Sequence, residues 1–285
     1  MIGISTSYFA ARGWNIYESV KRASDLGFSL IELGANHDFE ENIGETVARI
    51  RQDFPKTTFT QHCYFPPPFG KPIISNAGEG LTEENEKVLE TIFKAAKILR
   101  PKIVSFHCGT NCRYRFVGEA KGVKGFKGFA KEAEISFPVA SQNAKDFFHE
   151  ALRRGKEEGM KIAVENMWCI TGEKPLLTTP GDFTNFFQEF ENLNFLLDLA
   201  HAILNTGSAD PFLCLGEKIV EMHLSGIKNG RDHWSINEGL DLESLFGGIK
   251  SLPNLPILIF EHSGEVEEKE IMAEKNLVEK YFPAC

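Results

Sequence analysis

The stretch from Asn194 to Ala202 reads N-F-L-L-D-L-A-H-A and decides how the rest of the chain is interpreted. Its apolar part, Phe195 to Leu197, has the length of a buried strand, and Asp198 and His201 follow at the carboxyl end of that strand. A carboxylate and an imidazole at one strand end indicate a metal site. An isolated pattern of this kind also fits an aspartate that caps a helix and a histidine that packs in the core. The residues at the ends of the other expected strands distinguish between these two interpretations.

Seven other short apolar runs resemble this stretch, and six of them also end in His or Glu. The strands are expected at residues 2–5, 29–33, 57–61, 102–106, 161–164, 195–197, 217–222 and 257–260. Their carboxyl ends carry Glu32, His62, His107, Glu165, Asp198, His223 and Glu261. Eight strand and helix units without a break in composition predict one α/β domain over residues 1–285, a (β/α)8 TIM barrel. Because the active site of this fold lies at the carboxyl ends of the strands, these side chains should converge.

The composition is that of a soluble globular protein, with 42% hydrophobic and 25% charged residues. No segment is apolar over the length of a membrane span, and no export signal precedes the first strand, so we expect a cytoplasmic protein with no membrane partner. The six cysteines lack paired spacing, which favours reduced thiols over a disulfide framework. The net charge of −9 does not favour a nucleic-acid partner, although a local basic patch could suffice. An oligomer is compatible with the sequence.

Four candidate metal ligands end four consecutive strands, namely Glu165, Asp198, His223 and Glu261. Three carboxylates close together would repel one another, and a divalent cation removes that conflict. One histidine with three oxygen ligands suits Mn²⁺, Mg²⁺, Co²⁺ or Zn²⁺, and the donor set does not choose among them. The sequence therefore predicts a divalent metal as cofactor.

A second set of histidines, His62, His107, His201 and His233, is expected near the same barrel mouth. They could bind a second metal, hold substrate hydroxyls, or only occupy polar positions there. Glu32 is left out of the metal set because a lining or salt-bridged role fits it as well. Two cysteines, Cys63 and Cys108, directly follow strand-end histidines, and strand alternation predicts that both point away and pack in the core.

Residues 108–138 are expected to form a long loop insertion between a strand and the helix that starts at Ser141. The segment carries six basic and three acidic side chains, in contrast to the acidic chain as a whole. The candidate anion-binding residues of a lid over the site are Arg113, Arg115, Lys121 and Lys124. A solvated, mobile loop explains the same composition equally well.

The chain resembles the xylose isomerase-like barrel superfamily, which includes sugar epimerases, related isomerases and endonuclease IV. The resemblance covers nearly the whole chain and rests on T-Q-H ending at His62, H-C-G at His107, E-N at Glu165, D-L-A-H from Asp198, M-H-L at His223, R-D-H-W-S-I-N-E-G from Arg231 and I-F-E at Glu261. It implies a metal held by Glu165, Asp198, His223 and Glu261. For an epimerase-like member it also implies that Glu165 and Glu261 are the catalytic acid and base.

Two branches of the superfamily compete for the function. Endonuclease IV resembles this chain at most histidines, but its pattern has an aspartate two residues before the one matching His233. Arg231 stands there and Asp232 comes one residue later, which counts against a third metal position. The segment H-L-S-G-I-K-N-G-R-D-H from His223 resembles the sugar isomerase and epimerase branch instead.

We therefore expect a metal-dependent isomerase or epimerase that transfers a proton on a small sugar, sugar phosphate or other hydroxy-carbonyl compound. Such a reaction needs a base, an acid and a cation beside the developing enediolate, and Glu165 and Glu261 around one metal could provide them. The alternatives are an abasic-site DNA endonuclease with a multinuclear zinc centre and a metal-binding barrel without catalysis.

Overall fold

Eight parallel strands close a barrel in a computed structural model that describes residues 1–67, 76–119, 127–168 and 174–283. Around the barrel the order is β1-β12-β9-β8-β7-β4-β3-β2. The strands are β1 (Ile2–Ser5), β2 (Leu30–Leu33), β3 (Thr58–His62), β4 (Ile103–His107), β7 (Lys161–Glu165), β8 (Asn194–Asp198), β9 (Ile219–Leu224) and β12 (Ile257–Phe260). The predicted TIM barrel is confirmed, and His223 lies inside its strand rather than after it.

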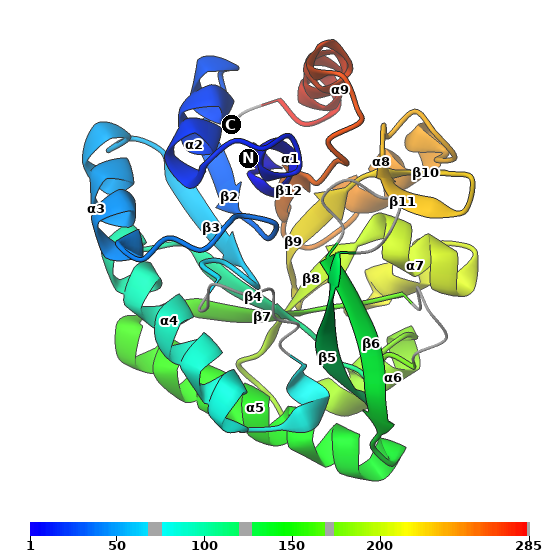
Figure 1. Ribbon diagram of the computed structural model, residues 1–285. Helices are drawn as coiled ribbons and strands as arrows, with labels where there is room; N and C mark the ends of the chain where they lie inside the picture. The colour runs from blue at the N-terminus through cyan, green and yellow to red at the C-terminus, as the bar shows by residue number, and fades with distance from the viewer. Residues whose placement is uncertain (68–75, 120–126, 169–173, 284–285) are drawn as a thin grey trace.

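Helices surround the barrel, as Figure 1 shows. They are α1 (Ser7–Ala10), α2 (Ile16–Asp25), α3 (Ile43–Asp53), α4 (Glu83–Leu99), α5 (Phe137–Glu158), α6 (Pro180–Phe187), α7 (Leu199–Thr206), α8 (Leu242–Lys250) and α9 (Glu268–Tyr281), with short 3-10 turns η1 (Ala77–Glu79) and η2 (Asp210–Leu215). Side-chain caps begin several of them: Thr82 accepts a hydrogen bond from the backbone of Asn85 at the start of α4. None of the helices within the described ranges is long and apolar enough to cross a bilayer.

The barrel interior is layered because alternate residues of each strand point inward. The layer farthest from the carboxyl ends of the strands is apolar, and we call it the barrel plug. It consists of Leu30, Ile103, Ala163, Leu196, Ile257 and Ile259. Gly3 belongs to the same level, since a Cβ there would lie 2.7 Å from Leu30 Cγ and 2.8 Å from Ile259 Cδ1. Buried polar side chains lie farther along the strands, among them Glu32, Thr60, Ser105 and Glu221. The strand-end residues lie beyond these and form the mouth.

The expectation of an irregular loop at 108–138 is wrong, because much of the segment forms an antiparallel ribbon. Strands β5 (Cys112–Glu119) and β6 (Lys127–Glu134) pair with each other, with Cys112 opposite Glu134. Glycines in both arms weaken the strand pattern, yet the two arms satisfy each other's backbone hydrogen bonds. Helix α5 also starts earlier than expected, with Pro138 in its first turn, where proline needs no N–H partner. Figure 1 shows this ribbon in front of the barrel.

Candidate metal centre

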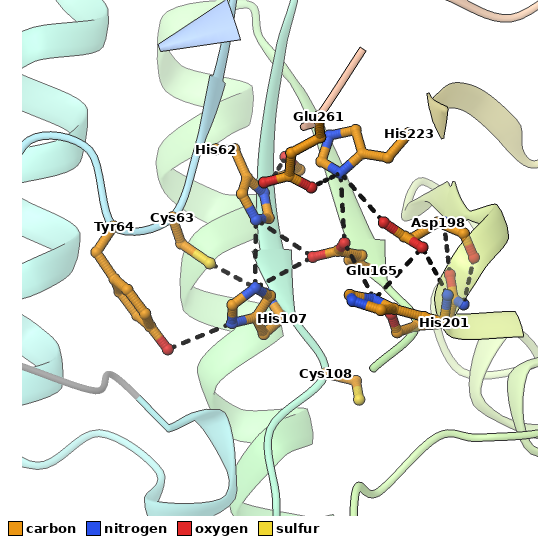
Figure 2. Close-up of polar contacts among 12 residues, drawn as sticks. His62, Cys63, Tyr64, His107, Cys108, Glu165, Asp198, His201, His223 and Glu261 are labelled. Atoms are coloured by element: carbon orange, nitrogen blue, oxygen red, sulfur yellow. Dashed lines mark hydrogen bonds and ion pairs between the residues drawn. The ribbon is translucent and has the colours of Figure 1, made fainter. Parts of the chain in front are cut away.

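The four predicted ligands Glu165, Asp198, His223 and Glu261 converge at the barrel mouth (Figure 2). One donor atom from each lies within 4.8 Å of the donor atoms of the others. Nδ1 of His223 is central, at 2.7 Å from Glu261 Oε2, 3.5 Å from Glu165 Oε1 and 3.8 Å from Asp198 Oδ2. We call these residues the four-ligand group. They come from β7, β8, β9 and the residue after β12, so closure of the barrel brings them together.

Several atoms of the four-ligand group lack hydrogen-bond partners among the described residues. Glu165 Oε2, Asp198 Oδ2 and His223 Nδ1 are buried, form no hydrogen bond of normal geometry and have only ion-pair contacts with facing side chains. Buried polar atoms normally have a partner, because an unmade hydrogen bond costs about 1–3 kcal/mol. A divalent cation in the four-ligand group would be a partner for Asp198 Oδ2 and His223 Nδ1, so these residues fit such an ion.

Asp198 fulfils both interpretations of the D-x-x-H pattern. Its Oδ1 accepts the backbone N–H of His201 at 2.7 Å and caps helix α7. Its Oδ2 faces His223 in the four-ligand group. One oxygen of the carboxylate therefore has a structural role, and the other belongs to the candidate metal group.

A second group lies on the other side of Glu165. Oε2 of Glu165 is 3.2 Å from Nε2 of His62 and 3.2 Å from Nε2 of His107, and the two ring nitrogens are 3.3 Å apart. Ligand atoms about 2.0–2.1 Å from a tetrahedral Zn²⁺ would be separated by about 3.3 Å, so this triangle has the size of one face of such a site. We call it the His62–His107 group. Glu165 therefore lies between two groups, with one oxygen toward each.

A third group consists of His201, Asp232 and His233. Asp232 Oδ2 lies 3.0 Å from His201 Nε2 and 3.4 Å from His233 Nε2, and the indole N–H of Trp168 donates to the same oxygen at 2.6 Å. The one-residue displacement of the aspartate does not prevent the group from forming. His233 has a left-handed backbone with φ +61, which breaks the alternation that would otherwise point neighbouring side chains apart. The displaced aspartate thus still reaches both histidines, and the argument against a third metal stays untested.

Each of the five histidines uses one ring nitrogen for an outer partner and turns the other toward a carboxylate of these groups. The outer contacts are His62 Nδ1 with Ser105 Oγ at 2.9 Å, His107 Nδ1 with Tyr64 Oη at 3.4 Å, His201 Nδ1 with Asn166 O at 2.9 Å, His223 Nε2 with Glu32 Oε2 at 2.9 Å and His233 Nδ1 with Glu261 O at 3.0 Å. Metal-ligating histidines show this arrangement, since the outer hydrogen bond fixes the ring and its tautomer. Glu32 has the salt-bridged position that the sequence allowed for it, and its absence from the ligand set stays a prediction.

Charge stabilises the metal-free groups as ion pairs. Burial opposes ionisation of Glu165, but His62, His107 and His223 hold the pKa of its carboxyl well below the usual range. Burial also opposes charge on His62, but the negative charges of Cys63 and Glu165 raise its pKa to about 9. The pKa of His201 rises to about 10, because Asp198 and Asp232 outweigh burial. At neutral pH these raised pKa values favour the protonated form of both rings.

The predicted lid residues are only partly described. Arg113 is the second residue of β5, is 53% exposed and pairs with Glu79 at 3.0 Å, outside the three groups. The side chain of Arg115 and the residues Lys121 and Lys124 lie outside the described part of the structure. The lid thus stays a prediction.

Several residues of the mouth were missed or misjudged from the sequence. Cys63 was expected to point away, but its Sγ accepts the backbone N–H of His107 at 3.3 Å. Tyr64 follows it and contacts His107, and Trp168 contacts Asp232. These residues lie beyond the ends of their strands, where alternation no longer predicts direction. In the sequence, only the motif H-C-Y from His62 to Tyr64 could have indicated that Cys63 and Tyr64 lie at the site.

The chain belongs to the Xylose isomerase-like TIM barrel family, whose model matches residues 20–279. An AP endonuclease of family 2 from Brucella melitensis is similar in structure, with a TM-score of 0.71 and 14% identity, over 97% of this chain and 98% of that one. A D-tagatose 3-epimerase-like protein has a TM-score of 0.70 and 16% identity, over 99% and 96% of the two chains. A D-psicose 3-epimerase has a TM-score of 0.67 and 12% identity, over 99% and 98%. At these identities the similarity shows the fold, and no curated protein matches the chain.

Proposed function

We propose that this protein is a metal-dependent hydrolase that cleaves a phosphate ester at a multinuclear centre. The observation that carries the proposal is the position of Glu165, whose two oxygens face two different sets of ligands. A carboxylate shared in this way is suited to join two cations, and sites with neighbouring cations are typical of phosphatases and nucleases. The similar AP endonuclease supports the same reaction class.

The chain's own residues hold and shape this site. The outer partners of the five histidines fix the ring orientations, and burial of Glu165, Asp198 and His223 keeps bulk water from them. When bound, divalent cations supply the positive charge that stabilises negative oxygen atoms during cleavage and promote ionisation of water. The site opens where His107 and His233 are partly exposed, at 24% and 32%. The net charge of −9 favours a small phosphate ester over a long nucleic acid.

Proton transfer on a hydroxy-carbonyl compound is the second candidate. Glu165 and Glu261 belong to the same four-ligand group, as an acid and base pair around one cation requires, and sugar epimerases are similar in structure. That reaction needs an oxygen of Glu165 free to approach a carbon-bound hydrogen. Oε2 of Glu165 instead lies between His62 and His107, which is why this reaction ranks second.

One paired experiment distinguishes the two reactions. Purified protein is first analysed for bound metal. It is then tested for cleavage of small phosphate esters and an abasic-site duplex, and for hydrogen exchange into ketoses in D₂O. The proposal expects two or three cations per chain and cleavage that is lost in Glu165→Gln. One cation per chain with Glu165-dependent exchange and no cleavage would establish the second candidate instead, and inactivity in both assays of fully loaded protein would contradict both.

A further inference from the structure

Two His-Cys dipeptides end neighbouring strands, His62-Cys63 after β3 and His107-Cys108 after β4. Both cysteines are buried, and both are free. Cys108 behaves as an ordinary core thiol. Its S–H group faces the carbonyl oxygens of Gly109 at 3.5 Å and Leu177 at 3.7 Å, and burial raises its pKa to about 11. Figure 2 shows Cys108 apart from the ligand groups.

Cys63 has the opposite surroundings. Its Sγ accepts a hydrogen bond, from the backbone N–H of His107, instead of donating one to a carbonyl. Its Sγ also lies within 4.8 Å of ring nitrogens of both His62 and His107. Sulfur atoms that bind metals are typically supported by such hydrogen bonds, which stabilise their negative charge. The turn after β3, closed by the hydrogen bond from Phe65 N to His62 O, places the thiol on this side.

The same point is approached by an unsatisfied buried carboxylate oxygen. Oε2 of Glu165 is 3.2 Å from both histidine nitrogens, its side chain is 1% exposed, and it has no hydrogen-bond partner among the described residues. Glu165 Oε2 and Cys63 Sγ thus each lie near ring nitrogens of the same two histidines. Two nitrogens, one oxygen and one sulfur are the number of donors that a tetrahedral transition metal takes.

We propose that Cys63 is a thiolate ligand at the metal position formed by His62, His107 and Glu165. The inference rests on the metal dependence of the proposed function and not on its reaction. Metal binding forms a metal–sulfur bond at Cys63, and the proton that the thiol and the facing histidines share is released to solvent, with no change in oxidation state. Because soft sulfur favours Zn²⁺, Co²⁺ or Fe²⁺ over Mg²⁺, the ligand narrows the choice of cation. With four protein ligands, a tetrahedral cation at this position has no place left for water or substrate. The inference therefore places catalysis at the neighbouring groups.

The test compares Co²⁺ binding by the full chain, Cys63→Ser and Cys108→Ser. Metal is removed, Co²⁺ is added stepwise, and the near-ultraviolet charge-transfer band of a cobalt–thiolate bond is recorded. We expect the band in the wild type and in Cys108→Ser and its loss in Cys63→Ser. A band that persists in Cys63→Ser overturns the inference, whatever happens in Cys108→Ser.

Zinc X-ray absorption of the wild type gives a second readout that needs no variant. We expect a sulfur neighbour at about 2.3 Å in protein loaded with Zn²⁺ until uptake is complete. Full metal uptake with nitrogen and oxygen neighbours only would overturn the role of Cys63 and leave the proposed hydrolase intact. Failure of the wild type to bind Zn²⁺ or Co²⁺ would overturn both.

Discussion

The two ends of the barrel interior bury side chains of opposite chemistry. The barrel plug is filled by aliphatic side chains, whereas the mouth buries carboxylates and histidines. The same strands supply both ends, as Leu196 and Asp198 on β8 illustrate. Burial of Leu196 stabilises the fold by removing apolar surface from water. Burial of Asp198 carries a cost for removing charge from water.

This difference indicates which end was shaped by function. In the plug, Gly3 makes room for Leu30 and Ile259, so close packing explains its residue types. At the mouth, buried atoms of Glu165 and Asp198 lack partners among the described residues, so packing does not explain them. The cation that we propose at the mouth would account for the contrast.

The largest expected effect is the loss of metal in Asp198→Asn. This substitution keeps an oxygen that can cap α7 but removes the charge from the four-ligand group. We expect metal affinity to fall by more than the roughly 100-fold that loss of an outer hydrogen-bond partner can cost. Elemental analysis and calorimetric titration measure it. Unchanged metal affinity would contradict the proposal that the four-ligand group at the mouth binds a cation.

Leu196→Ala tests the opposite end of the same strand. Leu196 is fully buried in the plug, and its truncation should lower the free energy of unfolding by about 2–5 kcal/mol. Metal stoichiometry in the folded fraction should stay that of the wild type, because no ligand is altered. Urea denaturation and elemental analysis test these two expectations. Loss of metal from folded Leu196→Ala would show that the two ends are coupled.

Glu32→Gln probes the polar layer between the two ends. Glu32 Oε2 contacts His223 Nε2 at 2.9 Å, and both side chains are fully buried. The glutamine preserves size but not charge, so His223 becomes a weaker ligand, and metal affinity should fall by roughly 10–100-fold. Calorimetric titration beside Thr60→Ser, a conservative change in the same layer, provides the control. Equal affinities in the two variants would contradict an orienting role for Glu32.

Metal binding should also strengthen as the pH rises from 7 to 9. The pKa values of about 9 for His62 and about 10 for His201 mean that protons compete with the cation below these values. Each proton released contributes about a tenfold change in affinity per pH unit. Protonated histidines stabilise the metal-free fold, and this stabilisation is lost as the pH rises through the same values. Titrations in buffers of different ionisation enthalpy count the protons, and zero release would contradict the ion-pair description.

Arg113→Ala should have the smallest effect. Arg113 on the ribbon is 53% exposed and pairs with Glu79 of η1, which is 15% exposed, outside the three groups at the mouth. Its removal should change the free energy of unfolding by less than about 1 kcal/mol. Urea denaturation measures this change. If the same variant raised KM for a phosphate ester far more than for a neutral substrate, the lid prediction would gain support.

The sequence by itself determined the barrel and the residues at its mouth. Short apolar runs at regular spacing specify strands, and their polar last residues converge in any closed parallel barrel, so Glu165, Asp198, His223 and Glu261 were predictable as neighbours. The β5–β6 ribbon was not predictable, because its strands pair with each other and have no apolar pattern that marks a buried face.

Only the tertiary structure decided how the residues beyond the strands are directed. Cys63 and Cys108 both belong to the buried core, as expected, but the thiol of Cys63 meets the backbone of His107, whereas that of Cys108 faces the carbonyls of Gly109 and Leu177. The side chains of Asp232 and His201 are in contact, and the next residue, His233, has a left-handed backbone that interrupts the alternation. Glu165 lies between two groups because side chains from other strands approach both of its oxygens. Alternation predicts side-chain direction only while a strand continues. Past its end, turn geometry and long-range packing set the direction, and neither is encoded in local spacing.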